Sequence, residues 1–386
     1  MTQGPRTNGK SIHTNGRNGH GKRKVRYAVV GLGYISQVAV LPAFAHAREN
    51  SELVALVSGD GEKLDKLSEK YSVSRSYRYE QYQECLRSGD VDAVYIGLPN
   101  HMHREYAEAA AAVGVHILCE KPMAKDPREC EGMIRAAEQN SVNLMIAYRL
   151  HFEEGNLSAA EAVREGKIGE PRLFRSAFSQ QVTPGNMRLA GEEGGGPIYD
   201  LGVYCINAAR NLFDAEPYEV FAYNATGKDE RFSEVPEMTA AVLRFPGDCL
   251  ATFECSFGAA DRSSYEIIGT KGVLKMDPAY EMVEDLKSEI TVEGRTRIST
   301  FKKRDQFGPE LVYFSNCILN GEHPEPDGWE GLADVRVITA ILESARLGKP
   351  VALTPFEKHE RPGIAQEIQR PPVEKPKLVH AAPPSR

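Results

Sequence analysis

The sequence predicts an α/β protein with a doubly wound parallel Rossmann sheet, followed by a domain with a large, open, mainly antiparallel sheet. Three observations lead to this fold class. The chain has 386 residues, a length that suits two domains. Up to residue 148, strongly apolar strands alternate with helical segments, as in a parallel sheet covered on both faces. From residue 149 the strands instead follow one another with little helix between them.

The first domain is expected to alternate strand and helix along its whole length. Its first strand lies in "VRYAVVGLGYIS" (Val25–Ser36) and runs through a glycine turn into a helix. The further strands are expected at Glu52–Asp60, Val91–Asn100, Val115–Pro122 and Val142–Arg149, and the helices at about 35–46, 62–71, 103–113 and 127–139.

The second domain is expected to be mostly strand, because its segments alternate apolar and polar residues. The strands are expected at 170–179, 218–226, 239–258 and 264–277, with one helix at 200–213 and two late helices at about 307–320 and 329–347. "PGD" (Pro246–Asp248) reads as a hairpin turn. We expect the late helices to pack at the domain boundary or on the sheet.

The two ends of the chain differ from the predicted domains in composition. Residues 1–24 are polar and rich in Asn and Gly, which is typical of a flexible arm. Residues 356–386 are rich in proline, and we expect them to be disordered. The predicted division is therefore an arm (1–24), a dinucleotide-binding domain (25–148), a substrate-binding and oligomerisation domain (149–355) and a tail (356–386).

Composition narrows the class of protein and its compartment. The formal net charge is −7, which gives no sign of nucleic-acid or membrane-surface binding. No apolar run approaches the roughly 18 residues of a membrane helix. The 7 cysteines are odd in number and include no CxxC pair, and the N-terminus resembles no export signal. These features predict a cytoplasmic protein with reduced thiols.

The turn after the first strand has the spacing of a dinucleotide-binding site. Gly31 and Gly33 allow a tight turn and a close approach of backbone to a pyrophosphate, and Ser36 stands where a third glycine is usual. The pattern by itself is weak, and an ordinary strand–helix turn is the alternative. The strand before it and the helix after it are the context that the motif requires.

The end of the second strand, "LVSGDGEK", decides which nucleotide is expected. NAD-binding folds carry an acidic residue here that holds the ribose, and this position aligns with Ser58. A serine hydroxyl and the ammonium of Lys63 suit the 2′-phosphate of NADP. Two alternatives stay open: a shift of one or two residues would make Asp60 an NAD-type acid, and Lys63 is equally typical of a solvated helix.

Two segments carry residues suited to proton transfer. Lys121 ends the fourth strand, at the edge where ligands bind in such sheets. Asp200 and Tyr204 lie four residues apart in "GGGPIYDLGVYCINAARNLF" (Gly194–Phe213), hence on one helical face. Hydride removal from a carbon needs a base for its hydroxyl proton, and a lysine cation near a tyrosine favours that role. The alternative makes Tyr204 a core aromatic and Asp200 a helix cap.

These motifs, in this order, resemble the Gfo/Idh/MocA oxidoreductase family over residues of about 25–355. The segments "YAVVGLG", "ALVSGDGEK", "DAVYIGLPNHMH", "CEKPMA", "GGGPIYDLGVYCINAARNLF" and "DVRVITAILESARLGKPV" carry the resemblance. Many family members have histidine where this chain has Tyr204. A tyrosine there is a feature of the glucose-fructose oxidoreductase subgroup, to which this sequence is most similar.

The resemblance implies roles for individual residues. Lys121 would position the substrate hydroxyl, Asp200 would hydrogen-bond the sugar, and Tyr204 would be the acid/base. The glycines before Asp200 would let the backbone approach substrate and cofactor. Cofactor contacts are expected from Gly31, Gly33, Tyr34, Ile35, Ser58, Lys63, Pro99, Asn100, His103, Glu120, Lys121 and Arg149. No metal site is expected, because a pair such as His101 and His103 on a loop, without carboxylate partners, is more often not a metal site.

The expected activity is that of an NADP-dependent sugar oxidoreductase, with NAD the less favoured cofactor. It would oxidise an aldose at C1 to a lactone and reduce a second sugar to an alditol with the same cofactor. One alternative is a simple dehydrogenase or an anhydrofructose-type reductase that releases its cofactor; another is a non-catalytic sensor on this fold. The resemblance also implies homodimers or homotetramers through the second sheet.

Overall fold

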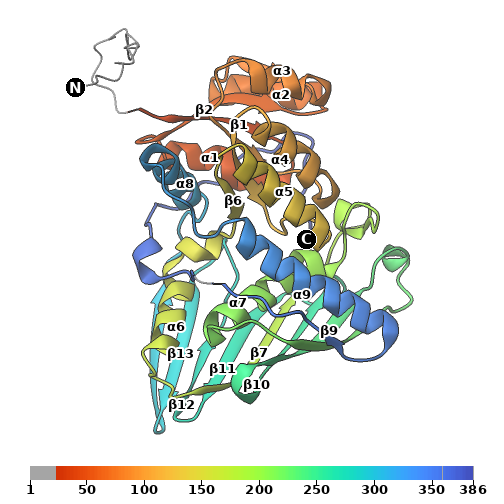
Figure 1. Ribbon diagram of the computed structural model, residues 1–386, viewed down its shortest axis with the longest axis vertical. Coiled ribbons are helices and arrows are strands. Elements are labelled where there is room, and N and C mark those ends of the chain that lie inside the picture. The colour runs from red at the N-terminus through yellow and green to blue at the C-terminus, as the bar shows by residue number, and fades with distance from the viewer. Residues whose placement is uncertain (1–22, 359, 386) are drawn as a thin grey trace, which may run out of the picture.

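The first domain is built on a parallel sheet. The computed structural model describes residues 23–358 and 360–385 (Figure 1). Its first sheet has six strands in the order β3-β2-β1-β4-β5-β6, all parallel. The strands are β1 (Val25–Val30), β2 (Ser51–Val57), β3 (Arg75–Tyr77), β4 (Ala93–Ile96), β5 (His116–Glu120) and β6 (Leu144–Ala147). The predicted Rossmann sheet is confirmed, and the strand order reverses between β1 and β4, where such sheets bind ligands.

Helices cover this sheet close to where the apolar periodicity predicts them. Asp126 caps α5 by accepting a hydrogen bond from the Glu129 amide (3.0 Å), and Pro127 occupies the first turn, where its missing N–H costs nothing. The helix after β1 is irregular, a π-helical turn followed by short helical pieces. The helical segments are η1 (Ser36–Val40), α1 (Leu41–Ala43), η2 (Phe44–His46), α2 (Gly61–Tyr71), α3 (Tyr82–Arg87), α4 (His103–Ala111) and α5 (Pro127–Gln139).

The second domain contains a mixed sheet of nine strands in the order β14-β13-β12-β11-β7-β10-β9-β8-β15. Its neighbours are antiparallel except β7 and β10, which pair in parallel. The open, mainly antiparallel sheet is as predicted, and Pro246–Asp248 forms the turn between β9 and β10. The strands are β7 (Pro171–Ser179), β8 (Glu219–Ala225), β9 (Met238–Phe245), β10 (Cys249–Ser256), β11 (Arg262–Gly269), β12 (Gly272–Met276), β13 (Leu286–Val292), β14 (Arg295–Phe301) and β15 (Val351–Ala352).

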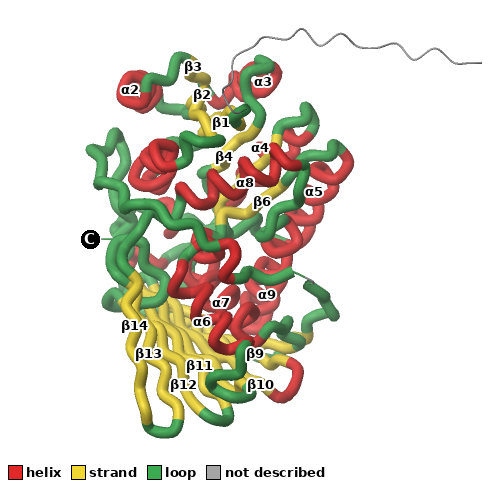
Figure 2. Tube along the Cα trace, turned by 90° about the vertical axis from the view of Figure 1, so that its left-hand side faces the viewer, coloured by secondary structure: helices red, strands yellow, loops and turns green. Residues whose placement is uncertain are grey.

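Helices lie on one face of the second sheet and leave the other face open (Figure 2). The covering helices are α6 (Glu154–Arg164), α7 (Val203–Phe213) and α9 (Gly328–Leu347). The last of these contacts both β8 of the second sheet and α5 of the first domain, so it joins the two domains. α8 (Gly308–Asn320) instead packs on the first domain, where Ser315 hydrogen-bonds Tyr27 (2.8 Å). Both late helices lie where they were expected.

The proline-rich tail differs from the disorder that its composition suggested. Within residues 360–385 it runs as an extended segment back over the first domain. The Arg370 side chain donates to the His46 carbonyl (2.8 Å), and the Val379 amide donates to Gln37 (2.8 Å). Proline favours an extended backbone, so such a segment can lie along a surface that offers it partners. The predicted N-terminal arm falls largely on residues 1–22, outside the described residues.

Residues 23–358 and 360–385 contain no helix long and apolar enough to cross a membrane. They also contain no group of three or more His, Cys, Asp or Glu side chains placed to hold a metal ion.

Candidate active site

The turn after β1 forms a cradle that fits a dinucleotide. Gly31 has a φ of 89°, and a Cβ there would lie 2.4 Å from the Gly97 carbonyl oxygen, so only glycine fits. A Cβ at Gly33 would meet no protein atom within 4 Å, so this backbone faces open space. Ser36 donates from Oγ to the Gly31 carbonyl (2.6 Å) and thereby tightens the turn where a third glycine is usual. Tyr34 and Ile35 follow on the same turn.

The loop after β2 lies where the adenosine ribose of a Rossmann cofactor is held. Ser58 is only 3% exposed, and its Oγ accepts a hydrogen bond from the Asp60 amide (3.2 Å), so the hydroxyl stabilises the loop. Asp60 caps α2 through the Lys63 amide (3.2 Å), and its other oxygen accepts from the His380 ring (2.8 Å). Asp60 is therefore engaged by its own helix and by His380, and direct contact of Ser58 or Lys63 with a cofactor stays a prediction.

Arg78 is a cation at this loop that sequence reasoning missed. Its guanidinium donates to the Gly59 carbonyl (2.5 Å), and a Cβ at Gly61 would lie 2.5 Å from its Nη2. It follows β3, a strand of three residues that was too short to be predicted. No local sequence pattern therefore marked Arg78, and only the pairing of β3 with β2 brings it to the ribose end.

The residues after β4 have two different roles. Pro99 and Asn100 are partly exposed at the edge of the cradle. The side-chain amide of Asn100 donates to the Gly194 carbonyl across the domain boundary (2.8 Å). His103 is fully buried, with Nε2 2.9 Å from the Leu98 carbonyl oxygen and Nδ1 3.1 Å from that of Pro122. The expected contact of His103 with a cofactor stays a prediction. Its side chain holds the turn after β4 against the turn after β5.

Lys121 and Asp200 meet as expected, together with a second cation. The Lys121 ammonium lies 3.1 Å from Oδ1 of Asp200, and the Arg188 guanidinium lies 2.5 Å from Oδ2. Burial opposes ionisation of Asp200, but Arg188 and Lys121 outweigh it and hold the pKa of this carboxyl well below its usual range. Burial also opposes the charge of Lys121, but Tyr204, Asp200 and Glu120 raise its pKa overall. Lys121 is therefore a cation at neutral pH.

Tyr204 lies between cations and aromatic rings. The Lys121 ammonium is 4.6 Å from the centre of its ring, and the Arg149 guanidinium donates from Nε to its hydroxyl (3.2 Å). The ring packs against Phe178 and Tyr280, with centroids at 5.4 Å and 5.7 Å. Arg149 is held in turn by Gln306 and the Tyr280 carbonyl, so it orients the hydroxyl from a fixed position. A hydroxyl that accepts from a cation keeps its own proton available for transfer.

Glu120 and Lys121 form a charged pair at the end of β5. The Glu120 carboxylate accepts hydrogen bonds from the Tyr95 hydroxyl and from the Lys121 amide (3.2 Å). Burial raises the pKa of Glu120, which Lys121 only partly offsets. A carboxylate held by the sheet in this way sets the position of the lysine backbone, and its expected contact with a cofactor stays a prediction.

The glycines before Asp200 serve a different purpose from the one expected. A Cβ at Gly195 would lie 2.5 Å from the Arg188 carbonyl oxygen, and a Cβ at Gly194 would lie 2.9 Å from Cβ of Asn100. The close approaches are thus between protein segments. They fold the loop tightly enough for Arg188 to reach Asp200, and they dock it on the first domain.

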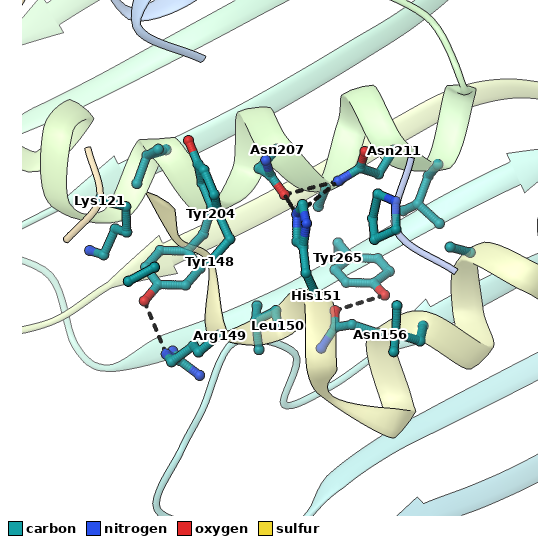
Figure 3. Close-up of a pocket in the computed structure, with 17 residues that line it drawn as sticks. Lys121, Tyr148, Arg149, Leu150, His151, Asn156, Tyr204, Asn207, Asn211 and Tyr265 are labelled. Carbon is teal, nitrogen blue, oxygen red and sulfur yellow. Dashed lines mark hydrogen bonds between the residues drawn. The ribbon is translucent and has the colours of Figure 1, made fainter. Parts of the chain in front are cut away.

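A cavity extends from these residues along α7, with Lys121, Arg149 and Tyr204 at one end and Asn211 at the other (Figure 3). His151 also lines it, and its Nε2 donates to the side-chain oxygen of Asn207 (2.9 Å). The other labelled polar groups in its wall are Tyr148, Asn156 and Tyr265. The cavity therefore offers hydroxyl-binding groups next to Tyr204.

Buried charges fix the helix that carries Tyr204. Arg210, one to two turns further along α7, is fully buried and forms ion pairs with Glu330 (2.9 Å) and Asp334 (2.5 Å) of α9. It also pairs with Glu216 (2.7 Å). Burial opposes the charge of Arg210, but its carboxylate partners raise its pKa overall. Because an unpaired buried charge is costly, this network specifies how α7 docks on α9.

Comparisons with known proteins agree with this architecture. Residues 25–148 match the model of the Gfo/Idh/MocA oxidoreductase family with its NAD-binding Rossmann fold, and residues 156–275 match that of the family's C-terminal domain. A D-xylose 1-dehydrogenase [NADP(+)] of Haloarcula marismortui is 34% identical over 337 residues, which cover 85% of this chain and 93% of that protein.

Solved structures give the same result. An aldose-aldose oxidoreductase from Caulobacter crescentus, complexed with glycerol, matches with a TM-score of 0.82 and 36% identity over 86% of this chain and all (100%) of that one. A 3-ketoreductase from Actinomadura kijaniata in complex with NADP and TDP-benzene matches with a TM-score of 0.76 and 26% identity, over 83% of this chain and 98% of that chain. The chain therefore belongs to the Gfo/Idh/MocA family of oxidoreductases.

Proposed function

We propose that this protein is an NADP-dependent sugar oxidoreductase that oxidises an aldose at C1 to a lactone and passes the hydride to a second sugar, which becomes an alditol. The observation that carries the proposal is the meeting of Lys121, Asp200 and Tyr204 at the carboxyl edge of the parallel sheet, beside the glycine cradle. The similarity to an aldose-aldose oxidoreductase and to NADP-dependent xylose dehydrogenases supports the class of substrate.

The chemistry assigned to each residue follows from its contacts. When bound, NADP supplies the hydride acceptor. Tyr204 in its phenolate form takes the proton of the C1 hydroxyl and becomes a neutral phenol. Lys121 and Arg149 stabilise the negative charge, which lies on the Tyr204 oxygen before the transfer and on the substrate oxygen after it. Asp200 holds Lys121 in place and offers its carboxylate to a sugar hydroxyl. In the second half-reaction, Tyr204 returns the proton to the oxygen of the acceptor's carbonyl group.

The preference for NADP is proposed to depend on cations at the ribose end. A 2′-phosphate carries nearly two negative charges at neutral pH, and Arg78 can donate to it with two nitrogens at once. Lys63 lies in the first turn of α2, where the helix N-terminus adds a favourable field. Asp60 is engaged by its own helix and by His380, so it is not placed as the free acid that an NAD ribose requires.

The alternatives differ in what happens to the cofactor and the proton. A simple dehydrogenase or an anhydrofructose-type reductase would release NADP(H) after each turnover. A non-catalytic sensor would need no proton-transfer group, whereas here Tyr204 has a cation 3.2 Å from its hydroxyl. We therefore rank the sensor last.

We further propose a homodimer through the open face of the second sheet, with pairing of dimers into tetramers as its extension. Large apolar side chains are exposed on this face, among them Tyr223 (63%), Val242 (38%) and Leu250 (37%) on adjacent strands β8, β9 and β10. An exposed sheet face that carries several large apolar side chains is commonly buried against a partner. A cytoplasmic location stays a prediction.

The decisive experiment is spectroscopic. The purified protein is expected to show the near-ultraviolet absorbance of reduced nicotinamide after one aldose is added, and to lose it when a second sugar follows, with no nucleotide supplied. Lactone and alditol should appear in equal amounts. A protein that needs added NADP for every turnover would be a simple dehydrogenase, and one that binds sugar without any change in absorbance would be a sensor.

A further inference from the structure

The end of the chain lies across the boundary between the two domains. Residues 378–385, here called the C-terminal strap, begin on the first domain and end on the second, and Figure 1 places the C-terminus where the domains meet. The strap lies outside the residues matched by either family model.

On the first domain the strap is fastened beside the glycine turn. Gln37, one residue beyond the serine of that turn, donates to the Val379 carbonyl (2.8 Å) and accepts from the Val379 amide (2.8 Å). Gln37 is only 1% exposed and also donates to the Leu32 carbonyl (2.9 Å), so it presents a fixed pair of partners. Leu378 and Val379 pack against the first domain's core, as do Tyr34 and Ile35 of the turn.

The next residue reaches the ribose end of the cradle. His380 places Nδ1 2.8 Å from Asp60 and Nε2 3.1 Å from Glu62. Its φ is 43°, a left-handed conformation that a histidine adopts only where its surroundings favour it. The strap thus touches the two places between which a bound dinucleotide extends, the glycine turn and the loop after β2.

The last anchor lies on the second domain. The Thr183 amide donates to the Pro384 carbonyl (2.9 Å), and Val182 forms an antiparallel bridge with Ser385. Thr183 belongs to the segment that leads to Arg188, which holds Asp200. Only three residues lie between His380 and Pro384, so that the chain between them spans at most about 14 Å when extended, and the strap passes directly from one domain to the other.

We propose that the C-terminal strap forms the outer wall of the cofactor site and slows the exchange of NADP. A cofactor seated between the glycine turn and Asp60 could leave only after the strap had released its contacts with Gln37, Asp60 and Thr183. The strap would thereby favour transfer of hydride between two sugars on one bound cofactor over release after each turnover. The inference rests on the proposed NADP site and not on the sugar chemistry.

The test is the rate at which bound NADPH leaves the protein, followed by stopped-flow fluorescence with excess NADP as competitor. Three forms are compared with the full chain: one that ends at Lys375, His380→Ala, and Val379→Pro, which removes the amide that donates to Gln37. Val373→Pro, upstream of the strap, is the matched control. Circular dichroism and thermal unfolding show whether each form folds.

Removal of the strap should speed NADPH release at least about tenfold, the change that loss of one hydrogen bond worth about 1.4 kcal/mol would produce. The two substitutions should give smaller increases, and Val373→Pro none. An unchanged release rate in all three forms would overturn the proposal. It would also be overturned if the altered forms bound NADPH more tightly only because association was faster, since the strap would then be a competitor of NADP. If the full chain released NADPH slowly, as proposed, but turned over no sugar, the result would count against the proposed function and not against the role of the strap.

Discussion

Replacement of Tyr204 by phenylalanine isolates the proposed proton transfer from the packing of the site. The ring would keep its contacts with Phe178 and Tyr280, and only the hydroxyl that accepts from Arg149 at 3.2 Å would be lost. Arg149 would retain Gln306 as a partner. The cost to the free energy of unfolding should therefore be about 1–2 kcal/mol, well below the 5–15 kcal/mol of a typical folded protein.

The effect on turnover should be far larger. Loss of a general acid–base group lowers the rate by about 10²–10⁴-fold, or about 3–5 kcal/mol of activation free energy. Steady-state oxidation of an aldose should show kcat and kcat/KM reduced together, while fluorescence titration should show unchanged affinity for NADP. Tyr148→Phe is the matched control, because the Tyr148 hydroxyl has no hydrogen-bond partner within the described chain. Turnover of Tyr204→Phe within about fivefold of the wild type would refute the assignment.

Four further predictions concern the site, the cofactor, stability and assembly. Lys121→Met should cut turnover with normal NADP affinity in a fluorescence titration; loss of nucleotide binding would make Lys121 a cofactor ligand instead. Arg78→Ala should weaken NADP binding by about tenfold to a hundredfold, the value of a charge-assisted hydrogen bond, and leave NAD binding unchanged; equal losses for both would contradict its phosphate role. Burial opposes the charge of His151, but Glu325 raises the pKa of His151 overall. The stability that the His151–Glu325 pair contributes is therefore complete below the unfolded pKa of histidine, about 6.5, and is lost as the pH rises through the folded pKa. Thermal unfolding of His151→Asn should therefore depend less on pH above 6.5 than that of the wild type, and identical profiles would remove the pair from this role. Light scattering at micromolar concentration should show a dimer that Val242→Lys converts to a monomer, and a monomeric wild type would exclude the sheet-to-sheet interface.

Much of the fold could be predicted because its signals are local. Strands such as β1 and β4 are apolar throughout, as strands buried on both faces must be, and the helices between them have regular apolar spacing. Two of the elements that were missed have weak local signals. β3 has only three residues, and β14 (Arg295–Phe301) is largely polar and exposed because it lies at the edge of the sheet. β7 and β10 pair in parallel although they are far apart in the sequence, and no residue pattern in either strand predicts this pairing.

The sequence by itself determined which residues could do chemistry. Lys121 at a strand end, and Asp200 four residues before Tyr204, have positions that follow from the periodicity of strand and helix, and the structure brings all three together. Only the tertiary structure decided their electrostatics and their surroundings. Arg149 reaches Tyr204 from 55 residues away, and His380 reaches Asp60 from 320 residues away. Such partners come from loops and chain ends whose path depends on how whole domains pack. A local sequence pattern does not predict that packing.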